Sequence, residues 1–151
     1  MNLLDELNKV DKVFIDTAPI IYYIEKHLQF GPLVMEVVKA FQSGKVEAFT
    51  SAITLTEVLV KPIELGNIEL AEKFAEFLKY GKNLTLVEIT VDIAERAGKL
   101  RGYYPNIKTL DAIQISTAIY VSADLFITND KKLKQIKEIK VIVLEDYLQN
   151  S

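Results

Sequence analysis

The fold is decided by a short stretch near the start of the chain, Val13-Phe14-Ile15-Asp16-Thr17-Ala18-Pro19. Its branched and aromatic residues predict a buried strand, and the proline that follows is well placed to start a helix. In an open parallel sheet, the residues that follow each strand lie at one edge, where ligands usually bind. We therefore expect the Asp16 carboxylate to face that edge.

The same alternation of strand and helix recurs along the chain. Short apolar runs predict strands at 13–15, 46–50, 84–89, 125–128 and 141–143. Helical periodicity predicts helices at 19–27, 32–42, 52–60 (ended before Pro62), 67–80, 91–100 (ended by Gly102) and 111–121, with a short one near 132–136. Strands separated by helices imply parallel crossovers, so the sequence predicts a single domain, residues 1–151, with a three-layer α/β/α fold around a five-stranded parallel sheet.

The composition is that of a folded protein without cysteine chemistry. Half of the 151 residues are hydrophobic, 26% are charged and none is cysteine. Disulfides, zinc–thiolate sites and thiol nucleophiles are thereby excluded, so the chemistry must come from oxygen ligands or hydroxyls. The first residues lack the basic start and long apolar run of a signal peptide, and no stretch reads as a membrane span. We therefore expect a cytoplasmic protein.

Charge is distributed unevenly, although the net charge is only −3. Residues 1–95 contain 9 basic and 15 acidic side chains, whereas residues 96–140 contain 9 and 4. The basic residues of the later half are Arg96, Lys99, Arg101, Lys108, Lys131, Lys132, Lys134, Lys137 and Lys140. Such a surface suits a polyphosphate backbone, but a solvated lysine-rich face explains it equally well. Tyr103 and Tyr104, in the loop before Asp111, could stack on bases or pack within a turn.

Three more acids occupy positions like that of Asp16. Asp130 follows the strand expected at 125–128, Glu57 lies in the helix after the strand at 46–50, and Asp111 opens an apolar helix. All of them could reach the same edge of the sheet. Mg²⁺ and Mn²⁺ prefer hard oxygen ligands, and Mg²⁺ keeps several waters, so a few carboxylates around an open site would suit either ion.

The alternative is that each acid has a purely structural role. Asp16 and Asp130 would cap the helices that follow them. Glu57 would complete a capping box with Thr54, and Asp111 would lie in a first helical turn. However, four such roles need not coincide with one edge and with basic flanks. Clustered carboxylates also repel each other unless they bind something, so a metal site explains the combination better.

Four segments of the chain resemble the successive motifs of PIN-domain nucleases. They are FIDT (14–17), TSAITLTEV (50–58), TLDAIQISTA (109–118) and FITND (126–130). The resemblance covers nearly the whole chain in the right order, and it is strongest to toxins of the VapC type. It implies strand order 3-2-1-4-5 and Mg²⁺- or Mn²⁺-dependent endoribonuclease activity. Carried over by match, the metal-binding and catalytic acids would be Asp16, Glu57, Asp111 and Asp130, supported by Thr128.

The expected reaction is hydrolysis of an RNA phosphodiester bond by metal-activated water. Asp16 and Asp111 would hold the principal metal, and the other two acids would complete or tune it. Thr17 and Thr128 would orient water or ligands. His27 is the only histidine, so a paired-histidine mechanism is excluded; we expect it to be a surface or capping residue.

The resemblance to VapC also implies a homodimer and a VapB-like antitoxin whose peptide arm occupies the acidic groove. A PIN fold used for RNA binding or RNA processing outside a toxin–antitoxin system is the main alternative. A phosphoacceptor receiver domain would need an acidic pair after the first strand, where Asp16 stands alone, and a lysine after the fifth, which Lys140 instead precedes. A haloacid-dehalogenase-like phosphatase would need an aspartate at the position of Ala18.

Overall fold

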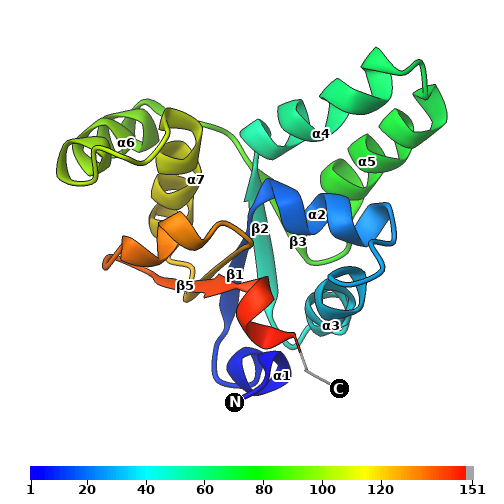
Figure 1. Ribbon diagram of the computed structural model, residues 1–151, viewed down its shortest axis with the longest axis horizontal. Helices are drawn as coiled ribbons and strands as arrows, with labels where there is room; N and C mark the ends of the chain where they lie inside the picture. The colour runs from blue at the N-terminus through cyan, green and yellow to red at the C-terminus, as the bar shows by residue number, and fades with distance from the viewer. Residues whose placement is uncertain (149–151) are drawn as a thin grey trace.

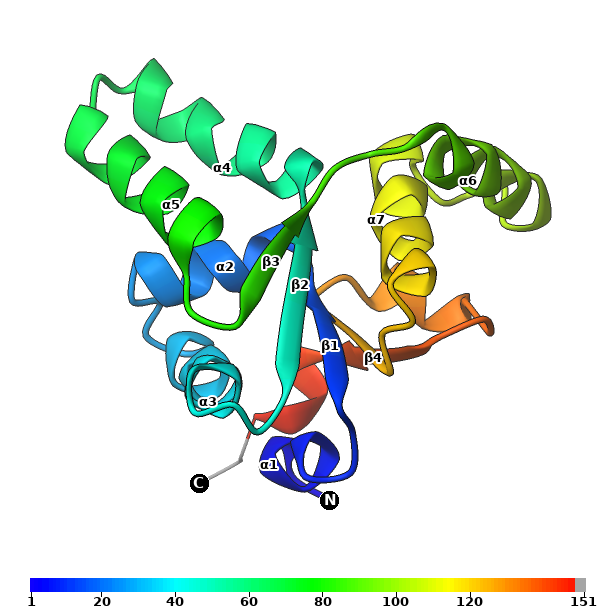
Figure 2. The same cartoon turned by 180° about the vertical axis from the view of Figure 1, so that it is seen from behind.

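Five short apolar segments form one parallel sheet between two layers of helices in the computed structural model, which describes residues 1–148 (Figures 1 and 2). The strands are β1 (Lys12–Ile15), β2 (Glu47–Ser51), β3 (Leu84–Val87), β4 (Leu125–Thr128) and β5 (Lys140–Val143). They pair in parallel in the order β3-β2-β1-β4-β5. The predicted sandwich and the implied strand order are thus confirmed. The last three residues of the predicted domain, 149–151, lie outside the described residues.

Helices cover both faces of this sheet. One face carries α1 (Leu3–Leu7), α2 (Thr17–Ile24), α3 (Gly31–Gln42), α4 (Ala52–Glu64) and α5 (Ile68–Tyr80). The other carries α6 (Val91–Tyr103), α7 (Thr109–Tyr120) and the 3₁₀ helix η1 (Lys131–Gln135). A second 3₁₀ helix, η2 (Leu144–Tyr147), follows β5. Within residues 1–148, no helix combines the length and the apolar character needed to cross a membrane.

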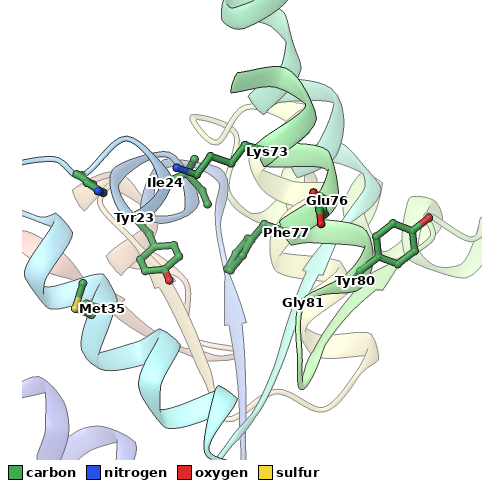
Figure 3. Close-up of a pocket in the computed structure, with 9 residues that line it drawn as sticks. Tyr23, Ile24, Met35, Lys73, Glu76, Phe77, Tyr80 and Gly81 are labelled. Carbon is green, nitrogen blue, oxygen red and sulfur yellow. The ribbon is translucent and has the colours of Figure 1, made fainter. Parts of the chain in front are cut away.

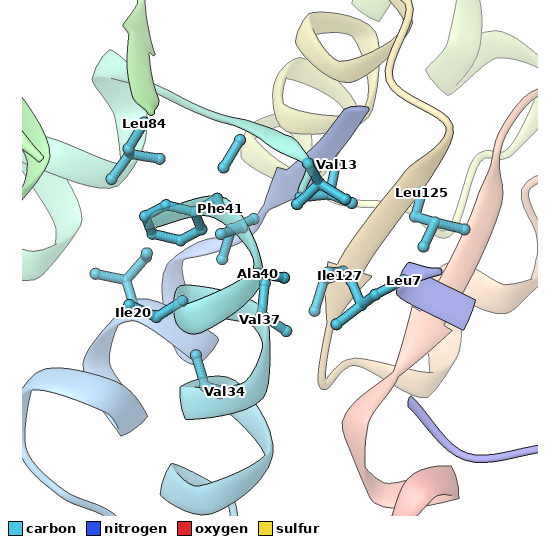
Figure 4. Packing of buried hydrophobic residues seen from close by; sticks show 14 of the residues in the cluster. Leu7, Val13, Ile20, Val34, Val37, Ala40, Phe41, Leu84, Leu125 and Ile127 are labelled. Carbon is cyan, nitrogen blue, oxygen red and sulfur yellow. The ribbon is translucent and has the colours of Figure 1, made fainter. Parts of the chain in front are cut away.

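The strands alternate their side chains between two cores. In β1, Val13 and Ile15 belong to the core beneath α2, α3 and α5, whereas Phe14 belongs to the core beneath α6 and α7. Figure 4 shows Val13 among residues of the first core. The ring of Phe14 stacks on that of Phe126 with centroids 5.3 Å apart. All these side chains are inaccessible to solvent because β1 and β4 are covered on both faces. This burial fixes which residues emerge at the carboxyl edge.

The helix boundaries differ from the predictions where local hydrogen bonds outweigh a sequence signal. Helix α4 continues through Pro62 to Glu64, because a proline in the last turn removes only one backbone hydrogen bond. The N–H of Leu65 still donates to the Lys61 carbonyl at 3.0 Å. Helix α6 likewise passes Gly102 and ends at Tyr103. Helices α1 and η2 were not predicted, since they are too short to show a period.

Helix α2 begins directly after β1 rather than at Pro19, because Asp16 is its N-cap. The N–H of Asp16 continues the sheet pairing by donating to the carbonyl of Ile127 at 2.9 Å. Strand β2 ends at Ser51 and β4 at Thr128, on either side of β1. The topology therefore brings Asp16, Ser51 and Thr128 together at the carboxyl edge of the sheet.

Candidate metal centre

Asp16 lies at the middle of the carboxyl edge and is only 8% exposed. Its Oδ1 accepts hydrogen bonds from the Thr17 backbone N–H at 2.8 Å and from Gln114 Nε2 at 3.3 Å, and its Oδ2 accepts from the Thr128 hydroxyl at 2.8 Å. These donors favour the ionised form, but burial outweighs them and raises the pKa of the Asp16 carboxyl. Asp16 therefore caps α2, as the structural alternative predicted, and also presents a costly buried charge.

Asp111 is half-buried in the first turn of α7. Burial, together with the negative charges of Asp16, Asp130 and Glu57, raises the pKa of its carboxyl to about 6. The positive charge of Lys108 opposes it. Gln114, one turn later on α7, lies 3.3 Å from Asp16 Oδ1, so the start of α7 faces the same edge of the sheet as Asp16.

Glu57 points from α4 toward the start of α2. Its Oε1 accepts a hydrogen bond from the Thr17 hydroxyl at 2.6 Å. The capping box with Thr54 is wrong, because α4 begins earlier than that pattern requires. Its N-cap is Ser51, whose hydroxyl accepts from the N–H of Ile53 at 3.1 Å. Glu57 is thus free of a capping role and is held by a residue that directly follows Asp16.

Asp130 has the capping role that the structural alternative gave it. Its Oδ1 accepts from the N–H of Lys132 at 3.0 Å at the start of η1. Its own N–H donates to the Thr128 hydroxyl oxygen at 3.2 Å. Since Thr128 also donates to Asp16, one hydroxyl links the two aspartates.

The four acids share a neighbourhood without forming a closed cage. Within residues 1–148, no three His, Asp or Glu side chains converge closely enough to hold a metal ion as they stand. The donor set nevertheless fits a hard divalent cation, because it consists of oxygen ligands whose mutual repulsion a cation would relieve. Glu57, Asp111 and Asp130 are partly exposed, which suits an ion that keeps some of its waters.

Sequence reasoning missed Gln114, which is 1% exposed on α7. Its Nε2 lies 2.7 Å from Thr54 Oγ1, 3.3 Å from Asp16 Oδ1 and 3.5 Å from Thr17 Oγ1. Its Oε1 accepts from the Ser51 hydroxyl. The sequence did offer a sign of this residue, because a long amide side chain lies between the apolar residues Ile113 and Ile115.

Most lysines near Asp130 are engaged with acids near the two ends of the chain. The ion pairs are Lys131–Glu145 at 3.0 Å, Lys134–Asp146, and Lys140–Glu6 at 2.8 Å. These pairs leave Lys132 and Lys137 as the members of the predicted basic run without an ion pair in the described part of the chain. The basic surface is therefore smaller than the sequence suggested.

The two tyrosines before Asp111 differ in their surroundings. Tyr104 is half-buried, and its hydroxyl donates to Glu138 at 2.7 Å, so it packs within the turn. Tyr103 is 79% exposed. Arg101 braces the loop between them and Asp111, because its Nε donates to the Ile107 carbonyl at 2.7 Å. Only Tyr103 retains a surface on which a base could stack.

His27 lies beyond the far end of α2 from Asp16, in the connection to α3. Its Nδ1 accepts from the backbone N–H groups of Gln29 and Phe30 at 3.2 and 3.0 Å. The predicted surface or capping role is confirmed. No imidazole takes part in the acidic site.

The fold and the site define an α/β protein with a carboxylate cluster at the carboxyl edge of a parallel sheet. A family model described as PIN domain matches residues 13–139. The chain therefore belongs to the PIN domain family, which confirms the resemblance. No curated protein matches the chain in sequence.

Solved structures that match the chain share its fold. A toxin–antitoxin complex from Klebsiella pneumoniae has a TM-score of 0.68 at 23% identity, over 87% of this chain and 97% of that one. DNA-bound VapBC from Salmonella typhimurium has a TM-score of 0.69 at 17% identity, over 89% and 98%. The sarcin–ricin-loop-cleaving toxin VapC20 of Mycobacterium tuberculosis has a TM-score of 0.60 at 14% identity, over 76% and 86%.

Proposed function

We propose that this chain is a Mg²⁺- or Mn²⁺-dependent endoribonuclease and the toxin of a VapBC-type toxin–antitoxin pair. The observation that carries the proposal is the buried Asp16 carboxylate, which is hydrogen-bonded at both oxygens and lies among three further acids. Membership in the PIN family supports a nuclease. The likeness in fold to a toxin described as cleaving the sarcin–ricin loop supports RNA as the substrate.

In this proposal, Asp16 and Asp111 hold the principal cation, and Glu57 and Asp130 complete the site. The chemistry supplied by the cation, when bound, is a lowered pKa for a coordinated water and partial neutralisation of the scissile phosphate. The protein itself orients the carboxylates toward one place through hydrogen bonds. Because the single histidine is absent from the site, proton transfer falls to carboxylates and water.

Two threonine hydroxyls orient the carboxylates. Thr128 donates to Asp16 at 2.8 Å, and Thr17 donates to Glu57 at 2.6 Å. Hydrogen bonds to a charged acceptor are the stronger kind, so each holds its acid in one rotamer. Removing either hydroxyl would loosen an acid without removing its charge.

Cleavage of RNA with analysis of the new ends tests the nuclease proposal. Attack by water should leave a 5′-phosphate and a 3′-hydroxyl, and cleavage should require Mg²⁺ or Mn²⁺ and stop with EDTA. Asp16→Asn, Glu57→Gln and Asp111→Asn should each reduce the rate by about 100-fold or more. Asp130→Asn should have a milder effect, because Asp130 also caps η1. Asp92→Asn, an exposed acid on α6, is the matched control.

A substrate with one 2′-deoxy sugar at the cut position separates the two mechanisms. The water mechanism does not use the 2′-hydroxyl as nucleophile, so cleavage of this substrate should continue. A 2′,3′-cyclic phosphate product, or full activity in EDTA, would contradict the proposal. Metal-independent RNA binding without any cleavage would instead favour the alternative of a PIN fold used for binding alone.

We propose that an antitoxin segment binds in an apolar groove between α2, α3 and α5 (Figure 3). Its volume is about 490 Å³, and the rings of Tyr23 and Phe77 meet in it with centroids 5.3 Å apart. Tyr80 and Met35, also in its lining, are 75% and 45% exposed. We infer that an apolar segment of a partner protein docks here, because the lining is apolar and its large side chains are exposed. That several matching structures are toxin–antitoxin complexes supports the existence of such a partner.

This location differs from the acidic groove that the resemblance to VapC implied. Lys26 and Lys73 lie among the lining residues with Glu76 as the single acid, so an acidic flank on the partner would add charge complementarity. The acidic edge itself would repel such a flank. A partner long enough to cover both surfaces would need a basic residue at the acidic edge.

Co-expression with the product of a neighbouring short reading frame tests the partner proposal. Tyr80→Glu and Met35→Asp should abolish co-purification and leave RNA cleavage intact, because both side chains are exposed and lie outside the acidic site. Tyr120→Glu, on α7, is the control for an exposed apolar residue changed to an acid. Undiminished co-purification in both groove variants would refute this docking site. Sedimentation velocity of the isolated chain tests the homodimer that the resemblance to VapC implies.

A further inference from the structure

We propose that Gln114 is a positioning residue, which holds the Asp16 carboxylate and the Thr17 hydroxyl, and through them Glu57, in the arrangement that the metal site requires. The inference rests on the proposed function, but its structural part concerns contacts in the metal-free protein. It assigns a role to a buried amide that lies one turn after Asp111 on the same helix.

The orientation of the Gln114 amide is fixed from one side. The Asp16 carboxylate accepts from the NH₂ group of Gln114, which also faces Thr54, and the Ser51 hydroxyl donates to the Oε1 atom on the other side. The opposite orientation would place the amide oxygen against the Asp16 carboxylate, with two acceptors in contact. Ser51 is itself fixed as the N-cap of α4. The end of β2 thus supplies the donor for the Gln114 amide oxygen while the NH₂ group meets the carboxylate.

The hydrogen bonds of Gln114 join three elements that lie far apart in the sequence. Its Nε2 contacts Thr54 on α4 at 2.7 Å, and Thr54 Oγ1 lies 3.2 Å from the Thr17 hydroxyl on α2. The Thr50 hydroxyl, 2.9 Å from Thr54, reaches the Ile15 carbonyl at 2.7 Å. A buried network in which each member finds a partner specifies one geometry. Here that geometry is the relative position of α7, α4 and the start of α2.

A purely structural role would not require an amide at this position. The other buried side chains on α7 that face the core include Ala112, Ile115 and Ala118, and an apolar residue could pack among them. A buried amide is unfavourable unless it is hydrogen-bonded, and the bonds of Gln114 include Asp16 and Thr17, of which the first is a principal acid and the second holds Glu57. Since Asp111 and Gln114 share α7, the network also fixes the distance between the two principal acids.

Mn²⁺ binding, measured by electron paramagnetic resonance without any RNA, tests the positioning role. Gln114→Met, which keeps the length and removes the donor, should weaken Mn²⁺ binding by about 10- to 100-fold, as expected for a residue that orients a metal ligand. Ser51→Ala should weaken it in the same direction. The double variant should be no weaker than Gln114→Met alone, because both changes remove the same constraint.

Ser116→Ala is the matched control. Ser116 is buried on the same helix, and its hydroxyl has no hydrogen-bond partner among residues 1–148. Removing it changes a buried polar group on α7 without touching the network, so Mn²⁺ affinity should equal that of the wild type.

The amide proton of Thr17, followed by NMR in EDTA, gives a readout that needs no metal. This N–H is hydrogen-bonded to Asp16 Oδ1, so its resonance should shift in Gln114→Met and stay unchanged in Ser116→Ala. A wild-type Thr17 resonance or a wild-type Mn²⁺ affinity in Gln114→Met would overturn the inference. If Gln114→Met does not fold, the same two measurements on Ser51→Ala decide the question. If the wild type binds no Mn²⁺ and cleaves no RNA, the proposed function fails, whereas the Thr17 resonance still reports whether Gln114 holds Asp16.

Discussion

Replacing Asp111 with asparagine should stabilise the metal-free protein near neutral pH. Burial, and then the charges of the neighbouring acids, raise the pKa of the Asp111 carboxyl from 3.8 to about 6. The native state therefore holds this proton more tightly than the unfolded state. The contribution of Asp111 to stability is highest below pH 3.8, falls as the pH rises to about 6 and is constant above that. Near pH 7 the Asp111 carboxyl of the wild type is ionised, so its full unfavourable contribution to the free energy of unfolding is present.

The expected change in the free energy of unfolding is the sum of two contributions. The difference between the two pKa values corresponds to about 3 kcal/mol, but Asp111 is only half-buried, so we reduce this to about 1.5 kcal/mol for solvent screening. The variant also loses a negative charge in the first turn of α7, which costs about 0.5 kcal/mol. The net gain in the free energy of unfolding should be about 1 kcal/mol.

Urea unfolding in EDTA at about pH 7.5 and about pH 3 measures this gain, which should vanish at the lower pH because that pH lies below the pKa of the carboxyl in both states. Asp92→Asn is the control, because Asp92 lies in the first turn of α6 and is exposed. It should lose about 0.5 kcal/mol without any compensating gain.

Repeating the unfolding with Mg²⁺ completes the test. At 100 times its dissociation constant, Mg²⁺ should stabilise the wild type by about 2.7 kcal/mol, and Asp111→Asn should lose most of that stabilisation. The reasoning fails if Asp111→Asn destabilises the metal-free protein by about 1 kcal/mol, as a lost helix-terminal interaction would, or if Mg²⁺ stabilises the variant fully.

Glu6→Gln should lower the free energy of unfolding by about 2 kcal/mol near neutral pH, because it removes the buried negative charge that pairs with the Lys140 ammonium. Hydrogen bonding to Lys140 lowers the pKa of Glu6 below 4.5, so this contribution should be lost as the pH falls below that value in acid unfolding curves. Lys132→Ala should reduce the salt dependence of single-stranded RNA binding by about 0.7 in log–log slope, whereas Lys131→Ala, already paired with an acid, should leave it nearly unchanged. Equal slopes for the two variants would show that ion pairing does not select the RNA-binding lysines. Phe126→Ala should cost about 4 kcal/mol in urea unfolding, because it empties a fully buried ring site between β4 and α7; a loss below about 1 kcal/mol would mean that the core collapses around the cavity.

The strands, and the edge of the sheet at which the four candidate acids should lie, could be predicted from the sequence. Apolar runs such as 13–15 and 125–128 can only be buried strands when helical segments separate them, and parallel crossovers then place the residues that follow them at one edge. The motifs around Asp16 and Asp111 carried the resemblance that implied strand order 3-2-1-4-5, which the sheet confirms. These features depend on local patterns, which a linear sequence displays directly.

Several features depended on contacts between distant segments. Glu57 does not form the predicted capping box, because the N-cap residue of α4 is Ser51 at the end of β2. Lys131 and Lys134, which follow β4, form ion pairs with Glu145 and Asp146, and only the folded chain brings these acids near them. Gln114 contacts both Ser51 and Asp16 because α7 packs beside the ends of β1 and β2. A side chain acquires its role from its partners in space, and tertiary packing alone determines those partners.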